Sequence, residues 1–255
     1  MGYPKKAAIM ILSALLFAAI FGCAGKNIDP KKAKEAEAYY LRAVSYMQKN
    51  KPQEALLNLQ EAIKLNPKDP RFYDAMGQIY FSDESFGKSE DAYKKAIEVD
   101  PAYTDARHNL GVLYNYLGRY DDAVQQFDSV LKDELYRNRA NTLNAMGWAY
   151  YKKGDYEKAE DAFMRTIKHD RMYLYAYDNL GKVYIDQKRY EEAVSILEQV
   201  LKLKSDYPEA RLDLGIAYLK LDKSGEAKTE FERVIALDPD GPIGKEAKKY
   251  LELLK

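Results

Sequence analysis

The chain of 255 residues carries 40 Lys and Arg residues against 40 Asp and Glu residues, so its formal net charge at pH 7 is zero. This balance supplies no excess positive field of the kind that attracts nucleic acid, and it argues against a nucleic-acid partner. Cys23 is the only cysteine and His108 and His169 are the only histidines. The composition therefore excludes a disulfide framework and argues against an intramolecular Cys/His metal site.

The first 22 residues have the order of an export signal. Lys5 and Lys6 precede an apolar run over residues 7–21, which is 15 residues long. A helix needs roughly 20 apolar residues to cross a bilayer core. We therefore expect residues 1–22 to be a signal peptide that is removed.

Residues 20–23, Ile-Phe-Gly-Cys, end this run and resemble the lipobox of bacterial lipoproteins. The resemblance implies that Cys23 is the acylated N-terminus of the mature chain. Each buried methylene of an acyl chain contributes about 0.8 kcal/mol, so several chains would hold the protein stably in a membrane. Ala24 follows where lipoproteins retained at the inner membrane often carry Asp, which implies the outer membrane, facing the periplasm. An ordinary signal peptide or an uncleaved anchor is the alternative.

Residues 23–35 read as the lipidated N-terminus and a polar tether, and beyond them the sequence repeats itself. A small residue recurs every 34 residues, with one interval of 36. A tyrosine follows each small residue by three positions, and an aromatic residue or Leu follows it by 16. The small residues are Ala43, Gly77, Gly111, Gly147, Gly181 and Gly215, and the tyrosines are Tyr46, Tyr80, Tyr114, Tyr150, Tyr184 and Tyr218.

This pattern resembles the tetratricopeptide repeat, a pair of helices whose small residues allow close approach. We expect an all-α fold: a right-handed superhelical solenoid of six repeats over residues 36–241, in which the tyrosines are core. A helix over residues 242–255, with Ala247, Tyr250, Leu251 and Leu254 on one face, would cap the end. The repeats span 36–69, 70–103, 104–139, 140–173, 174–207 and 208–241.

The positions one and four residues after each small residue face the concave surface in this family, and neighbouring positions add to them. Aromatic and amide side chains alternate with aliphatic ones there, which suits an extended peptide or an amphipathic helix of a protein partner. Some of these side chains could instead be covered by the chain's own N-terminal segment or pack only between adjacent first helices. The predicted groove residues are Tyr40, Met47, Phe81, His108, Val112, Asn115, Tyr116, Asn144, Trp148, Tyr151, Ile185, Ile216 and Leu219.

An enzymatic function is not expected. His108 has no Cys or Ser partner at a recognisable spacing, and no glycine-rich phosphate loop follows a predicted strand. We therefore assign no catalytic residue, no metal ligand, no cofactor other than the lipid on Cys23, and no small-molecule substrate.

The interval of 36 residues marks a two-residue insertion between the third and fourth repeats. Its sequence contains Asp133, Leu135, Tyr136 and Arg139 and is similar to the Asp-x-Leu-Tyr-x-x-Arg stretch of the PilF/PilW/Tgl family, the outer-membrane lipoproteins called pilotins of type IV pili. The resemblance implies a scaffold that binds an outer-membrane secretin subunit and helps the secretin to assemble or localise. The insertion would shape the middle of the solenoid or offer Tyr136 and Arg139 to the partner.

Two other functions remain open. An adaptor for peptidoglycan hydrolases would use the same groove without needing the insertion. A structural subunit of another envelope-assembly or export complex would bind permanently through its convex faces.

Overall fold

A computed structural model describes residues 28–254, which form thirteen α-helices and no strand. The predicted signal peptide and Cys23 lie outside these residues. The chain divides into two compact units between Phe72 and Tyr73, a point inside helix α4 (Pro70–Ser82). The predicted all-α fold class is confirmed.

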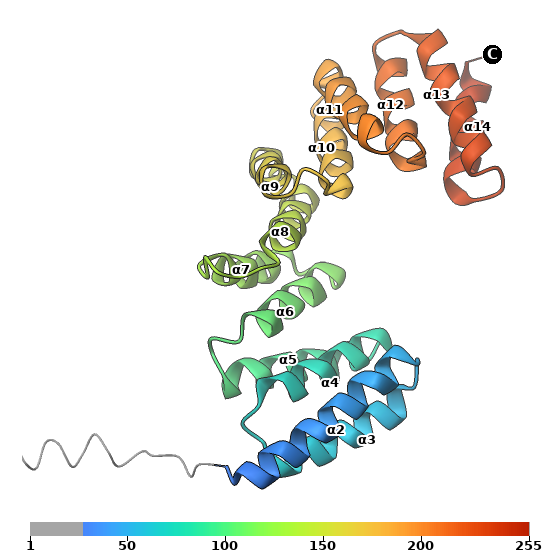
Figure 1. The fold of residues 1–255 in the computed structure, drawn as a ribbon. Helices are drawn as coiled ribbons and strands as arrows, with labels where there is room; N and C mark the ends of the chain where they lie inside the picture. Colours follow the sequence, from blue (N-terminus) through green and yellow to red (C-terminus); the bar gives the residue numbers. More distant parts are fainter. Residues whose placement is uncertain (1–27, 255) are drawn as a thin grey trace, which may run out of the picture. The chain divides into compact units, whose positions relative to one another are not determined.

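The first unit contains the antiparallel helices α2 (Pro30–Gln48) and α3 (Pro52–Leu65), which lie side by side (Figure 1). Small side chains allow the two helices to approach closely, because Ala36 and Ala43 on α2 and Ala55 on α3 are fully buried. Phe72 is also buried and contacts the ring of Tyr40 at a centroid distance of 5.3 Å.

The start of α2 corrects the predicted tether. Residues 30–35, which we assigned to a polar tether, are already helical. Asp29 accepts a hydrogen bond from the backbone N–H of Lys31 (2.9 Å), and Pro30 takes the first helical position. An Asp followed by Pro is a helix-start signal, because the Asp side chain accepts from an N–H of the first turn and Pro has no N–H to leave unpaired.

The second unit contains the end of α4 and ten further helices, which follow one another as antiparallel pairs and end in a single helix. Within it, each helix packs on the next one along the chain from α5 onward. These helices are α5 (Phe86–Val99), α6 (Thr104–Tyr116), α7 (Tyr120–Leu131), α8 (Arg139–Lys153), α9 (Tyr156–His169), α10 (Leu174–Asp186), α11 (Tyr190–Leu203), α12 (Pro208–Lys220), α13 (Ser224–Leu237) and α14 (Pro242–Leu253).

A glycine beneath a large side chain recurs in every pair of the second unit. Phe163 on α9 is fully buried and its ring covers Gly147 on α8, where an added Cβ atom would lie 2.7 Å from the ring. Gly181 stands in the same relation to Leu197. Glycine is required at these positions because any side chain would push the two helices apart.

The recurring tyrosines are core in part. Tyr114 and Tyr184 are buried, but their hydroxyl groups reach the rim and donate hydrogen bonds of 3.0 Å to Glu90 and Glu160. The other four described members, Tyr46, Tyr80, Tyr150 and Tyr218, are half-buried. The phenol ring fills apolar space while its hydroxyl stays at a polar edge, so these residues are only partly the core that we predicted.

Helix α14 packs on α13, beside which it lies in Figure 1, and also contacts α12. Tyr250 stacks on the ring of Phe231 with a centroid distance of 5.1 Å and an interplanar angle of 9°. Ala247, Leu251 and Leu254 join the same apolar cluster, so the face expected to be apolar is the one that packs.

We predict that Gly147→Ala destabilises the protein by about 1–2 kcal/mol, because overpacking against Phe163 outweighs the gain of roughly 1 kcal/mol in helix propensity. Denaturant unfolding followed by circular dichroism measures this change. Gly87→Ala is the matched control, because no atom lies within 4 Å of its added Cβ, and it should be neutral or stabilising. In a Phe163→Ala background, where the large side chain over Gly147 is removed, the cost of Gly147→Ala should shrink. Equal costs in both backgrounds would contradict the close packing.

Candidate functional site

The first helices of successive repeats contact one another directly: α6 with α8, α8 with α10, and α10 with α12. We call α6, α8, α10 and α12 the first-helix layer. Residues one and four positions after each glycine lie on it and are half-buried or exposed, in contrast to the buried Leu113, Val183 and Ala217 between them. This layer therefore presents side chains that the pairs themselves leave uncovered.

A hollow of about 410 Å³ opens on the layer between α4, α6, α8 and α10. Six predicted groove residues line it, and we call it the aromatic hollow. Three further lining residues were missed. The predicted six are Phe81, Val112, Asn115, Tyr116, Asn144 and Trp148, and the three missed are Ala145, Tyr175 and Asn179.

The missed residues lie before the glycine in their repeats, and the positions that we took from the family follow it. Tyr175 stands six positions before Gly181 and is 66% exposed. A helix face continues at spacings of three and four residues, so positions 175 and 179 extend the stripe that contains 182 and 185. This helical periodicity could have identified Tyr175 and Asn179 from the sequence.

The aromatic rings of the hollow are held by other rings. Tyr116 is 62% exposed, yet its ring contacts Phe81 and Phe86 at centroid distances of 5.5 Å and 5.0 Å. Trp148 contacts Tyr151 at 5.4 Å. Tyr151 in turn donates a hydrogen bond of 2.7 Å to Asp186. Large exposed rings fixed in this way lose little conformational entropy when a partner binds.

Amide side chains form the polar part of the hollow. Asn115 donates a hydrogen bond of 2.8 Å to the carbonyl of Ala145 on α8, and Asn179 donates one of 3.1 Å to Asn144 Oδ1. These bonds join neighbouring first helices. The Asn115 Oδ1 atom is buried and has no hydrogen-bond partner among the described residues. An unsatisfied acceptor of this kind costs stability and can be satisfied by a donor that enters the hollow.

His108 is not part of the hollow. Its Nδ1 lies 2.9 Å from Thr142 Oγ1, and its ring packs beside those of Phe127 and Tyr136. Burial lowers the pKa of His108 below its ordinary value, so the ring is neutral at pH 7. The structure does not bring this predicted groove residue into the aromatic hollow, because the insertion supplies Tyr136, whose ring lies beside the imidazole.

The other predicted groove residues are spread along the chain. Tyr40 and Met47 belong to the first unit and are half-buried there. Ile185 lies further along the layer and packs against the apolar core of the fifth pair. Ile216 and Leu219 pack in the cluster that contains Phe231 and α14.

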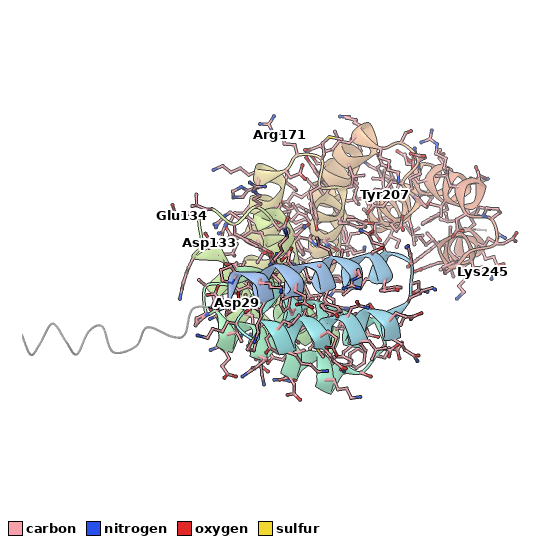
Figure 2. All side chains as sticks on the ribbon, turned by 60° about the horizontal axis from the view of Figure 1, so that its bottom comes forward. Asp29, Asp133, Glu134, Arg171, Tyr207 and Lys245 are labelled. Atoms are coloured by element: carbon pink, nitrogen blue, oxygen red, sulfur yellow. The ribbon has the colours of Figure 1, made fainter. Side chains whose placement is uncertain are left out.

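The insertion between α7 and α8 is held by hydrogen bonds to nearby residues. Asp133 accepts a hydrogen bond from Thr104 (3.1 Å), and Tyr136 donates one to Asp105 (2.9 Å). Arg139 donates to the backbone carbonyls of Leu131 (3.0 Å) and Asp133 (2.7 Å). Asp133 and Glu134 are labelled near the edge of the molecule in Figure 2, and the next residue, Leu135, is 90% exposed. Tyr136 and Arg139 therefore shape the junction, and Leu135 is a large apolar side chain that stays exposed there.

Within residues 28–254, no cluster of His, Cys, Asp or Glu side chains has a geometry that could hold a metal ion. The same residues contain no helix that is both long and apolar enough to cross a membrane.

Comparison with protein families matches models described as tetratricopeptide repeat over residues 36–69, 70–103, 105–172, 144–208 and 184–249. The chain is thus a tetratricopeptide-repeat protein, and its fold is one that binds other proteins.

The chain is homologous to "Type IV pilus assembly protein PilF" of Pseudomonas aeruginosa. It is 20% identical to this protein over 143 residues, which are 56% of this chain and 57% of that one. The solved structure "Functional Characterization of Pseudomonas Aeruginosa pilF" matches with a TM-score of 0.75 at 15% identity, covering 86% of this chain and 99% of that one. The structure of PilW, titled "widely conserved type IV pilus biogenesis factor", matches with a TM-score of 0.76 at 17% identity, covering 83% and 97%.

Other relatives share only part of their length with this chain. "Anaphase-promoting complex subunit 3" of Schizosaccharomyces pombe is 28% identical over 134 residues, which are 52% of this chain and 20% of that protein. The sequence matches thus span a fifth of that relative and 57% of PilF.

We predict that Arg139→Ala destabilises the protein by about 2 kcal/mol, since hydrogen bonds to a charged group contribute about 1.5–3 kcal/mol each and the two carbonyls would lose their donor. Urea unfolding measures the loss. Arg137→Ala is the matched control, because Arg137 is exposed in the same insertion, and it should change stability by less than about 0.5 kcal/mol. Equal effects of the two substitutions would show that the insertion is not held by Arg139.

Proposed function

We propose that this protein is a membrane-anchored pilotin of type IV pilus biogenesis, which binds an outer-membrane secretin subunit and assists secretin assembly or localisation. The observation that carries the proposal is the homology to PilF, together with the match of the solved PilF structure over 86% of this chain. The insertion with Asp133, Tyr136 and Arg139 stands where the pilotin resemblance requires it.

The aromatic hollow is the proposed secretin-binding site. Phe81, Tyr116, Trp148 and Tyr175 supply large apolar surfaces, and the amides at its base can fix the register of a bound segment. A secretin segment that seats its apolar side chains here is shielded from aggregation before the ring closes. Few residues carry most of the binding energy in such interfaces, and Trp148 is the only tryptophan of the chain.

The proposed anchor lies at Cys23. Acylation there would hold the repeats at the membrane in which the pore forms, facing the periplasm. Tethering raises the local concentration of a bound subunit without any new contact. The anchor and the hollow thus make separate contributions to secretin assembly, and both can be tested.

We predict that deletion of the gene removes secretin multimers while the monomer remains, as seen on gels run without boiling. Cys23→Ala should reproduce part of this loss through mislocalisation.

Trp148→Ala should weaken secretin binding by about 2 kcal/mol or more at unchanged helical content. Leu57→Ala is the control, because Leu57 is a 62% exposed apolar residue of α3, outside the hollow.

Normal multimers and normal pili in the deletion strain would contradict the proposal and favour the adaptor for peptidoglycan hydrolases. Multimers lost on deletion but restored fully by the Trp148→Ala chain would leave the pilotin function standing and place the binding site elsewhere.

A further inference from the structure

Two carboxylates face each other on the first-helix layer beyond the aromatic hollow. Asp178 on α10 is 4% exposed, and Asp213 lies on α12, the next first helix. Lys182 Nζ lies 2.5 Å from Asp178 Oδ2 and 3.7 Å from Asp213 Oδ2. The second distance is too long for a hydrogen bond, so Lys182 fully satisfies only one of the two acids.

Three buried oxygen atoms of this cluster have no hydrogen-bond partner among the described residues: Asp178 Oδ1, Asp213 Oδ2 and the Tyr207 hydroxyl. Tyr207, labelled in Figure 2 at the start of α12, is 6% exposed. Buried acceptors are almost always paired, because an unpaired one costs about 1–3 kcal/mol. When both carboxyl groups are ionised, their unpaired oxygens lack a donor, and carboxylates prefer a charged one; the Tyr207 hydroxyl can donate as well as accept.

The charges of the cluster are also unbalanced. Asp178 and Asp213 stand against Lys182, while Glu209 and Glu246 add negative potential from α12 and α14. Burial, followed by the charge of Asp178, raises the pKa of Asp213 to about 8, although Lys182 opposes the rise. The phenol groups of Tyr151 and Tyr250 also face Asp213 and are neutral at pH 7. At neutral pH the free protein therefore keeps a proton on the carboxyl pair.

Equivalent contacts between other first helices have no such imbalance. Asn109 donates to Asp74 (2.8 Å), and Asn179 donates to Asn144 (3.1 Å), so each acceptor there meets a donor. Of these three contacts, only the one between α10 and α12 places an acid opposite an acid at this register, although Asp105 on α6 also adds negative potential at Asp74. A second acid is thus not required for packing the layer.

The carboxyl pair is continuous with the aromatic hollow. Asn179, the neighbour of Asp178, lines the hollow, and so does Tyr175, whose ring contacts Tyr207 edge-on at 6.5 Å. The side chain of Lys182 is 34% exposed, so the cluster reaches the surface through it. A segment that lies in the hollow and continues toward α12 would pass over Lys182.

We propose that the Asp178–Asp213 pair binds a cationic side chain, Arg in preference to Lys, of the same partner segment that fills the aromatic hollow. The inference rests on the proposed function of that hollow. Lys182 occupies the site in the free protein and turns out to solvent when the partner's guanidinium enters. Arg is preferred because its planar fork donates to several oxygens at once and is more weakly hydrated than an ammonium group. The shared proton leaves to solvent as the guanidinium binds.

A display library of random 12-residue peptides, selected on the full chain purified in detergent, tests this inference without any secretin. Peptides selected on the wild type should combine aromatic or aliphatic residues with Arg or Lys at a constant spacing. Peptides selected on Asp213→Asn should keep the apolar residues and lose the basic one. Asp161→Asn, which changes an exposed acid that pairs with Arg165 on α9, is the control and should select the wild-type pattern.

A selected peptide then gives two quantitative results. Replacing its Arg by citrulline, which is uncharged, should weaken binding at least tenfold on the wild type and little on Asp213→Asn. Affinity for the Arg peptide should rise with pH between 6 and 8, by up to about tenfold per unit, because the complex holds one proton fewer than the free protein. Asp178→Asn is the second variant, should Asp213→Asn fold poorly.

Selected peptides without basic residues, or with the same basic residue on wild type and Asp213→Asn, would overturn the inference. Apolar residues enriched without a basic one would leave the aromatic hollow as a binding site and remove only the cationic position. Selection of no peptide would remove both. A failure of the secretin role alone would leave the library result unchanged, so the two outcomes are distinguishable.

Discussion

The second unit depends on one close contact, in which a glycine of each first helix lies under a large side chain of the second. Phe163 over Gly147 is the pattern, and Leu197 over Gly181 is its aliphatic version. Because this contact lies between the two helices of a pair, the second helix packs mainly on that one face of the first helix. The outer face of each first helix is then free to contact the next first helix and to carry exposed side chains.

Two kinds of side chain occupy this outer face of the first helices. The amides of Asn115 and Asn179 join neighbouring first helices, and the rings of Tyr116 and Trp148 stand above them as exposed surface. The carboxyl pair of Asp178 and Asp213 takes the place of such an amide contact further along the layer. The same register that holds the repeats together thus arranges an apolar region and an acidic region in series.

Repeat spacing and the tetratricopeptide resemblance together predicted the fold class and six residues of the hollow, because the period assigns every glycine and the family's concave positions are counted from it. They could not predict His108, whose ring lies beside Tyr136 of an insertion that breaks the period. Nor could they predict that Asp178 meets Asp213, since this contact depends on how two successive first helices cross. The helix start at Pro30 was missed because Asp29 and Pro30 suit a tether and a helix cap equally by composition.

Site-specific photo-crosslinking in cells tests most directly whether the first-helix layer is the surface that holds the partner. A photoreactive phenylalanine analogue at Tyr116, in the hollow, is compared with one at Met164, a 53% exposed residue of the second helix α9. The account predicts a crosslink to secretin from position 116 and none from position 164. A crosslink from position 164 with none from position 116 would contradict it.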